Sequence, residues 1–317
     1  MNGSWRGGTF THKITPHLWF DKQAREAAEL YASLITASKL RSVKTLRNTP
    51  SGDCDIVSFE LSGQPFMAIS AGPLFKFNPS ISFHLKCKTK DEVDAIFERL
   101  SQGGKVLMPL GSYPWSERYG WLEDKYGLSW QVIFVGHREV GQRITPVLMF
   151  VGKVCGDTED AVSFYAEVFK KAPSGPGVKG ETGANILSRY GKGEEPDREG
   201  TVRYASFTLL GQEFGAMDSA REHQFAFNEA ISFIVPCETQ REIDYFWETL
   251  SADPTAEQCG WLKDKYGLSW QITPTILNDM LGGKDEKRTA RVTQAFLKMK
   301  KFDIAALTRA YEGSRAE

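Results

Sequence analysis

From residue 14 onward, the chain opens with a stretch in which apolar and polar positions alternate. ITPHLWF at positions 14–20 predicts a strand, and Asp21 is a suitable N-cap for a helix that runs to about Leu34. Apolar residues recur at helical spacing in that helix, so one of its faces is expected to pack on a sheet. Three short strands are then predicted near 39–47, 55–62 and 64–70. One strand, one helix and three strands make up a βαβββ module.

The same pattern begins again at residue 80. A strand over 80–87 precedes a helix over 91–100, and three further strands are expected near 106–110, 118–123 and 128–135. The first half of the chain therefore holds two modules. The second half repeats the scheme from Ile144, with a long loop rich in Gly, Pro and charge over 175–200. It lacks most of the segment that is expected to form a loop at 111–117 of the first half.

After residue 274 the periodicity becomes helical. Val292, Ala295, Phe296 and Met299 form an apolar stripe, and Asp303 is the expected cap of a last helix. The interspersed charges of this segment are typical of a solvated helix face. The domain organisation that follows is a flexible leader at 1–12, domain 1 at 13–139, domain 2 at 142–276 and a C-terminal helical tail at 277–317.

An internal repeat relates the two halves. Residues 120–131 read GWLEDKYGLSWQ and residues 260–271 read GWLKDKYGLSWQ, so eleven of twelve positions are identical. Shorter matches precede this block in the same order, and each copy is far longer than a solenoid unit, which indicates two whole domains. Within the block, Asp124 and Asp264 are expected to be turn residues. Trp130 is expected to pack in the core.

Composition and charge argue against several classes of function. The formal net charge of -1 gives no electrostatic reason to expect a nucleic-acid or acidic-membrane partner. No apolar run is long enough to span a bilayer, and the N-terminus lacks the apolar core of a secretory signal. The five cysteines are odd in number and contain no CxxC pair, which argues against a disulfide framework or a structural zinc site. We expect a cytoplasmic protein.

The tandem modules, the ITPxLxF start, the NxxISF strand, the YGWLxDKYGLSWQ block and the tail KMKKFDIAALTRAYEG together resemble the vicinal-oxygen-chelate superfamily. Within it they are similar to the branch called 3-demethylubiquinone-9 3-methyltransferase-like, or PhnB-like. The resemblance runs from Ile14 to the C-terminus. It implies an α+β fold of tandem glyoxalase-like domains, each of two βαβββ modules that form a curved mixed sheet, with a small ligand held in the resulting cup. Relatives include glyoxalase I, extradiol dioxygenases and bleomycin-binding resistance proteins, so the fold serves both metalloenzymes and pure binders.

Metal-dependent members of the superfamily carry His or Glu ligands at equivalent strand positions. By motif, these positions are Thr15, Glu60, Ser82 and Gln131 in domain 1 and Thr145, Thr208, Ser232 and Gln271 in domain 2. One carboxylate among them is too few for a catalytic divalent ion, which takes about three protein ligands. We therefore expect no cofactor, with a divalent metal elsewhere as the alternative. No Gly-rich strand-to-helix turn suggests a methyl-donor cofactor either.

Strand parity nevertheless predicts a polar site in domain 1. If Thr15, Ser82 and Gln131 point inward, then His17, His84 and Ser129 do as well, and Glu60 lies on the same face. His17, Glu60 and His84 are therefore candidate catalytic residues, able to bind a metal or to perform acid–base chemistry. The competing interpretation is that these polar groups only hydrogen-bond one another or water. Candidate ligand-binding residues are Thr15, Trp19, Ser82, Trp115, Ser129 and Gln131.

Three functional hypotheses remain open from the sequence. The first is a binder of a small, partly aromatic molecule without the usual metal site. The second is a glyoxalase- or dioxygenase-like enzyme that uses His17, Glu60 and His84. The third is structural, in which domain 2 closes the cup of domain 1 as an intramolecular pseudo-dimer, with further homodimerisation left open.

Overall fold

The computed structural model describes residues 14–49, 51–173, 180–283 and 285–313 of the chain, so the predicted leader at 1–12 lies outside the described residues. The first half contributes β1 (Thr15–Phe20), α1 (Ala24–Leu34), β2 (Lys39–Thr49), β3 (Gly52–Leu61), β4 (Gln64–Ser70), β5 (Ile81–Cys87), α2 (Lys90–Ser101), β6 (Lys105–Tyr113), β7 (Ser116–Glu123) and β8 (Ser129–Phe134). The second half contributes β9 (Ile144–Val151), the short 3-10 helix η1 (Gly152–Val154), α3 (Thr158–Lys171), β10 (Gly183–Arg189), β11 (Val202–Leu209), β12 (Gln212–Ser219), β13 (Ile231–Cys237), α4 (Gln240–Leu250), β14 (Trp261–Lys263) and β15 (Ser269–Pro274). The tail holds α5 (Ile276–Gly282), α6 (Glu286–Phe296) and α7 (Ile304–Glu312).

The strands form two mixed sheets, and each sheet takes one module from each half of the sequence. Sheet A has seven strands in the order β14-β15-β13-β1-β4-β3-β2, and sheet B has eight in the order β10-β11-β12-β9-β5-β8-β7-β6. The halves join where β1 pairs antiparallel with β13 and where β5 pairs antiparallel with β9. The predicted tandem pair of modular domains with curved mixed sheets is confirmed. Strands from the two halves of the sequence therefore pair with one another.

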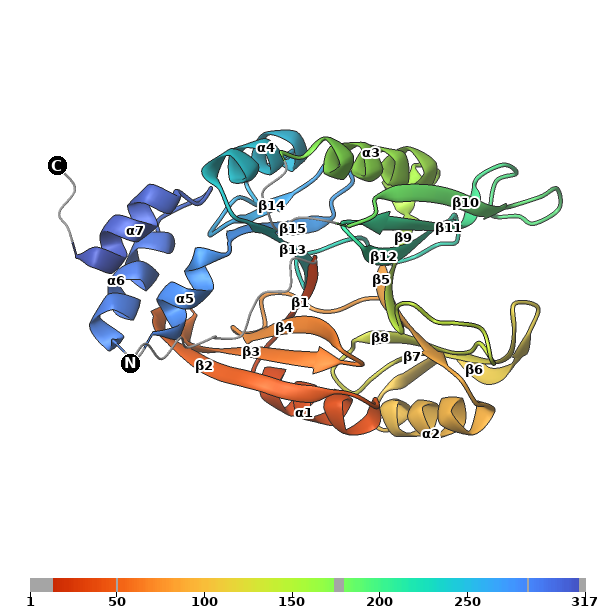
Figure 1. Ribbon diagram of the computed structural model, residues 1–317. Helices are drawn as coiled ribbons and strands as arrows, with labels where there is room; N and C mark the ends of the chain where they lie inside the picture. Colours follow the sequence, from red (N-terminus) through yellow and green to blue (C-terminus); the bar gives the residue numbers. More distant parts are fainter. Residues whose placement is uncertain (1–13, 50, 174–179, 284, 314–317) are drawn as a thin grey trace.

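The helices cover the outer faces of both sheets. In Figure 1, α1 and α2 lie along one side of the molecule and α3 and α4 along the other, with the strands between them. The buried apolar residues of both halves form one cluster beneath the helices, in which Trp130 is fully buried beside Tyr31 and Trp270 is buried beside Tyr165. The prediction that Trp130 is a core residue is confirmed. Both the apolar core and the two sheets therefore contain residues from both halves.

A buried carboxylate organises each copy of the repeated block. Asp124 Oδ1 accepts hydrogen bonds from the backbone N–H groups of Tyr126 and Leu128, and its Oδ2 accepts from Tyr31 Oη and Trp130 Nε1. Asp264 makes the same four bonds in the second half, with Tyr266, Leu268, Tyr165 and Trp270 as the donors. Both residues are turn residues, as predicted. Each also ties the helix that covers one sheet to the last hairpin of the other.

Three local expectations differ from the structure. Asp21 is not the cap of α1, because the helix begins at Ala24 with Gln23 as its N-cap residue. The loop predicted over 175–200 contains the edge strand β10, whose side chains are mostly exposed and so gave no apolar alternation; residues 174–179 lie outside the described residues. The loop predicted at 111–117 is the end of a hairpin, because β6 and β7 pair as far as Tyr113 and Ser116.

The tail takes the place of a missing strand. The module formed by β13, α4, β14 and β15 has no counterpart of β6, so β14 lies at the edge of sheet A. Beside that edge, the N–H groups of Cys259 and Gly260 donate to the carbonyl oxygens of Met299 and Lys300, which follow α6. The helices α5–α7 stand at the sheet A end of the molecule (Figure 1). The predicted cap is confirmed, since Asp303 accepts from the N–H of Ala306.

Candidate functional site

The inner face of each sheet is the face turned away from the covering helices, and the predicted site residues are divided between the two sheets. His17 and Glu60 lie on β1 and β3 of sheet A, whereas His84 lies on β5 of sheet B. The expectation that these three residues share one cup is therefore wrong. The alternation along each strand predicts which face of the strand a side chain occupies. The two modules of domain 1, however, belong to different sheets, so they do not form one cup.

His17 is buried in an aromatic environment in sheet A. Its ring packs edge-on against Trp261 of β14, with ring centroids 5.3 Å apart, and Nδ1 has no hydrogen-bond partner. Burial lowers the pKa of His17 to about 3, so the imidazole is neutral at physiological pH. Trp19, a predicted ligand-stacking residue, lies beside it against Trp261 and donates its indole N–H to the carbonyl of Gly72.

Glu60 is held by cations and not by His17. Its carboxylate makes ion pairs with Arg41 and, at 3.7 Å, with Lys39, both on the neighbouring strand β2. Its charge is thus compensated by two cations of the edge strand. The register across β4 also places Glu60 in the row of Pro65 rather than in that of Met67, which pairs with His17.

In sheet B, a connected polar network surrounds His84. Gln131 donates through Nε2 to Ser82 Oγ at 2.7 Å, and its Oε1 accepts from Tyr119 Oη at 2.6 Å and from His84 Nε2 at 2.5 Å. Because Oε1 can only accept, His84 carries its proton on Nε2 and keeps a lone pair on Nδ1. Of the predicted residues, the structure thus brings together His84, Ser82 and Gln131.

The second half of the chain completes this site. The ring of Tyr204, on β11, stacks on His84 with centroids 5.9 Å apart and planes inclined by 15°. Thr145, on β9, is the register partner of His84, and its buried Oγ1 has no hydrogen-bond partner. Burial lowers the pKa of His84 to about 4 and raises that of Tyr204 to about 12, so both are uncharged near neutrality. Lys86 and Glu213, the charged pair nearby, neutralise one another at 3.1 Å.

Aromatic side chains lead from the surface to this network. Trp115, at the tip of the β6–β7 hairpin, is 53% exposed and stacks on Tyr113 with centroids 5.2 Å apart. It also packs edge-on against Tyr119, whose hydroxyl contacts Gln131. Trp115 therefore lies at an exposed hairpin tip, and its role at the rim of a ligand site stays a prediction. Ser129 has a different role, since it accepts the indole N–H of Trp121 at 2.8 Å.

The sequence analysis did not predict the three tyrosines near the network, which are Tyr113, Tyr119 and Tyr204. Tyr119 could have been found from parity, because it lies two residues before Trp121 and therefore on the same face of a strand already predicted. Tyr204 could not, because it comes from the other half and reaches His84 only through the β5–β9 pairing. Thr15, the remaining predicted ligand-binding residue, lies on sheet A opposite Ile234.

The residues at the family's metal-ligand positions do not fit a divalent ion. Cross-pairing regroups them into Ser82, Gln131, Thr145 and Thr208 on sheet B and Thr15, Glu60, Ser232 and Gln271 on sheet A. In each set the glutamine donates to the serine, so two of the four side chains bind one another. Within the part of the chain that the structure describes, no group of three or more His, Cys, Asp or Glu side chains could hold a metal ion.

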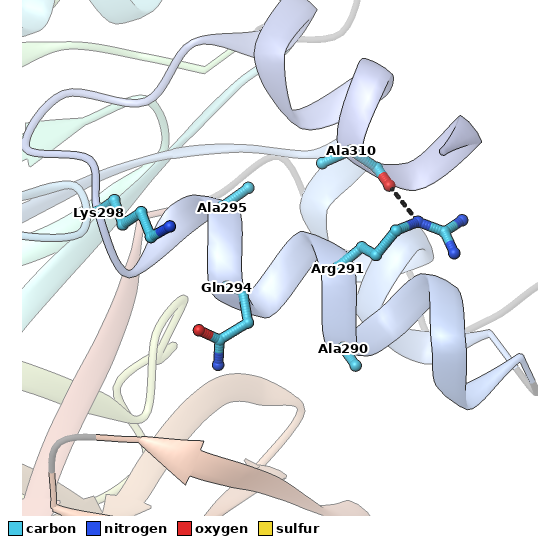
Figure 2. Close-up of a pocket in the computed structure, with 6 residues that line it drawn as sticks. All are labelled: Ala290, Arg291, Gln294, Ala295, Lys298 and Ala310. Carbon is cyan, nitrogen blue, oxygen red and sulfur yellow. Dashed lines mark hydrogen bonds between the residues drawn. The ribbon is translucent and has the colours of Figure 1, made fainter. Parts of the chain in front are cut away.

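Two surface hollows lie away from both inner faces. One, of about 450 Å³, is formed by α6 and α7, and in Figure 2 Arg291 crosses it to donate to the carbonyl of Ala310. Arg291 also donates to the carbonyl of Tyr311, so it satisfies the last turn of α7. The other, of about 550 Å³, is lined by α3 and by Lys265 and Tyr266. Neither contains a side chain of the His84 network.

The described helices include none long and apolar enough to cross a bilayer.

Comparison with known proteins gives the family of the chain. The sequence model for 3-demethylubiquinone-9 3-methyltransferase matches it twice, over residues 12–133 and 142–273. A PhnB protein from Bacillus cereus is 41% identical over 39% of this chain and 99% of its own length, with a TM-score of 0.37. Protein PA1353 from Pseudomonas aeruginosa is 25% identical over 37% of this chain and 93% of its own, with a TM-score of 0.34.

Glyoxalase I from Zea mays is 11% identical, covers 86% of this chain and 96% of its own, and has a TM-score of 0.51, which supports the shared fold. No curated protein matches the chain. The two family matches fall on the two halves already defined by the repeat and by the modules. The chain thus belongs to the 3-demethylubiquinone-9 3-methyltransferase family, in tandem form and with the vicinal-oxygen-chelate fold.

Proposed function

We propose that the chain binds a small, uncharged, partly aromatic molecule on the inner face of sheet B. The observation that carries this proposal is the network of His84, Gln131, Tyr119 and Ser82 beneath the exposed aromatic rim at Trp115. Ligand sites combine apolar and aromatic walls with a few fixed polar groups, and this face has that composition.

The electrostatics of the face favour a neutral ligand. His84 and Tyr204 are uncharged near neutrality, and Lys86 and Glu213 already form an ion pair. A charged ligand would lose its hydration without gaining a free counter-charge from these groups. A ligand hydroxyl or N–H could instead donate to His84 Nδ1, and Thr145 Oγ1 offers a second hydrogen bond from the neighbouring strand.

A binding test can use three probes of similar size: phenol, benzoate and benzylamine. Binding is followed by the quenching of Trp115 fluorescence, identified as the difference from the Trp115→Phe variant. We expect phenol to bind at least about tenfold more tightly than either charged probe, since desolvation of an unpaired charge exceeds the 1.4 kcal/mol that corresponds to a factor of ten.

The repeat supplies a matched pair of variants for this test. Gln131→Leu breaks the network and is expected to weaken phenol binding about five- to tenfold, whereas Gln271→Leu, at the same place in sheet A, leaves it unchanged. Equal effects of the two substitutions, or preference for a charged probe, would show that the proposed site is wrong.

The alternative function, an enzyme with a catalytic base, would now depend on His84 alone. His17 and Glu60 are on another sheet, so His84 alone could serve as a base, through the lone pair on Nδ1. A base with a pKa of about 4 is weak near neutral pH. Methyl transfer is not part of the proposal, because the chain carries no glycine-rich turn for a nucleotide-like methyl donor.

A further inference from the structure

The tryptophans that open the repeated block occupy different positions in the two halves. Trp121 donates its indole N–H to Ser129 Oγ at 2.8 Å. Its twin, Trp261, lies against the rings of His17 and Trp19, with centroids 5.3 and 6.1 Å away. Ser269, the twin of Ser129, is 1% exposed and its Oγ has no hydrogen-bond partner. One nearly identical sequence therefore supports two side-chain arrangements.

Two features differ around the tryptophans, namely the residues that face them and the backbone of the preceding glycine, which has φ of +83° at Gly260 but no positive φ at Gly120. In sheet A, β1 presents His17 and Trp19 to Trp261, and both rings make edge-on contacts with it. At the equivalent positions of β9 in sheet B, the sequence has Val147 and Met149. These side chains offer no ring, so Trp121 keeps its hydrogen bond with Ser129 instead.

Two buried polar atoms are left without partners by the position of Trp261. They are His17 Nδ1 and Ser269 Oγ, and the register places their residues in one row, since Ser232 pairs with both His17 and Ser269. Buried polar atoms usually have hydrogen-bond partners, so two buried atoms without a partner on one face need an explanation. If Trp261 took the position of Trp121, Ser269 would gain the indole N–H and the ring would leave His17.

We propose that Trp261 is a gate that swings between His17 and Ser269 and, when open, exposes a second ligand site on the inner face of sheet A. In the first half, Trp121 already occupies the open position, on a backbone that differs at the preceding glycine, since φ is +83° at Gly260 and not positive at Gly120. Edge-on aromatic contacts and one net hydrogen bond are of similar strength, so the two positions are close in free energy.

The site behind the gate fits an uncharged ligand with an apolar body and one hydrogen-bonding group. Met67 and Ile69 lie on β4 in register with His17 and Trp19, and Ile234 lies on the other side of β1. Two charged residues of this face, Glu60 and Lys263, are held in ion pairs with Arg41 and with Glu229, and a third, Lys44, lies on the edge strand β2 in the row of Ile69. His17 Nδ1, a buried atom of this face without a hydrogen-bond partner, can serve as a polar contact for the ligand.

Chemical modification of His17 tests the gate. Diethyl pyrocarbonate acylates accessible neutral imidazoles, and peptide mass spectrometry gives separate rates for His17 and for the exposed His137, which serves as the internal reference. Ser269→Ala removes the acceptor of the open state, so we expect the His17 rate to fall about fivefold, the factor of a typical net hydrogen bond. Trp261→Ala should raise the rate severalfold, and Ser129→Ala, in the first half, should leave it unchanged.

The ligand is tested with 4-fluorophenol as the uncharged probe and 4-fluorobenzoate as the charged one. We expect 4-fluorophenol to protect His17 from acylation in the wild type and in His84→Ala, which lacks the network of sheet B, and 4-fluorobenzoate to give no protection. Equal His17 rates in the wild type and Ser269→Ala, or an equal fall in Ser129→Ala, would overturn the gate. Failure of 4-fluorophenol to protect His17 would overturn the ligand site.

Discussion

At the residue scale, the two buried histidines make the stability of the fold sensitive to acid. His17 lies among aromatic rings and His84 within an amide and hydroxyl network, and neither has a carboxylate partner. Burial holds the pKa of His17 at about 3 and that of His84 at about 4, well below the usual value near 6.5. The folded protein thus keeps both rings neutral at a pH at which the unfolded chain has taken up protons.

This difference predicts the sign of the pH dependence. Between about pH 6.5 and pH 4 the unfolded state binds more protons, so the free energy of unfolding falls as the pH decreases, by up to about 1.4 kcal/mol per pH unit for each histidine. Denaturant unfolding at several pH values checks this. His17→Gln and His84→Gln should each reduce the slope near pH 5 by about that amount, and an unchanged slope in either variant would contradict the burial of a neutral ring.

At the element scale, the tail is part of the fold and not an appendage. Gly260, at the start of β14, has φ of +83°, and a Cβ atom there would lie 2.4 Å from Phe302 of the tail. Gly267, in the following turn, has φ of +86° and open space around it. Both positions favour glycine for their backbone, but only Gly260 needs it for close packing as well.

Alanine at these two positions separates the two effects. Gly267→Ala should lower the free energy of unfolding by about 1–2 kcal/mol through backbone strain alone. Gly260→Ala should lower it by a further 1–3 kcal/mol or so because of the clash with Phe302. In a double-mutant cycle with Phe302→Ala, that extra loss should largely vanish; a purely additive result would mean that Phe302 does not pack there.

Some elements could be predicted from the sequence and others could not. Alternation and helical spacing predicted the modules, the buried Trp130 and the cap at Asp303, because each of these depends on residues close together in the chain. β10 was missed because its side chains are mostly exposed, as at an edge strand, and leave no apolar alternation. The strands that pair with β1 and β5 could not be predicted, because alternation indicates which face a residue occupies but not which strand lies beside it. For that reason His84 was predicted but its neighbour Tyr204 was not.

At the scale of the whole molecule, the two halves of the sequence do not coincide with the two sheets. Each half has its own buried aspartate, Asp124 or Asp264. Each inner face, in contrast, needs one module from both halves. Asn78 donates to the carbonyl of Ala226 and Asn228 to that of Lys76, so the loops of the two halves also exchange reciprocal hydrogen bonds.

Dividing the chain between the halves tests this arrangement. A fragment ending at residue 139 leaves β1 and β5 without their antiparallel partners β13 and β9, so we expect it to dimerise or to be insoluble. Co-expression with the fragment that begins at residue 140 should restore a soluble one-to-one complex, measured by light scattering. A stable monomer of the first fragment would contradict the shared sheets.

The cross-pairing of the halves has one more consequence. Two copies of a single-domain relative that associated in this way would be obliged by symmetry to carry two identical concave surfaces, and every mutation would alter both. When the two domains are joined in one chain, the two concave surfaces no longer have to be identical. The segments around His17 and His84 belong to different modules, so each can change by mutation without the other. A single polypeptide can in this way acquire two unlike specificities while its covering helices and buried aspartates stay the same.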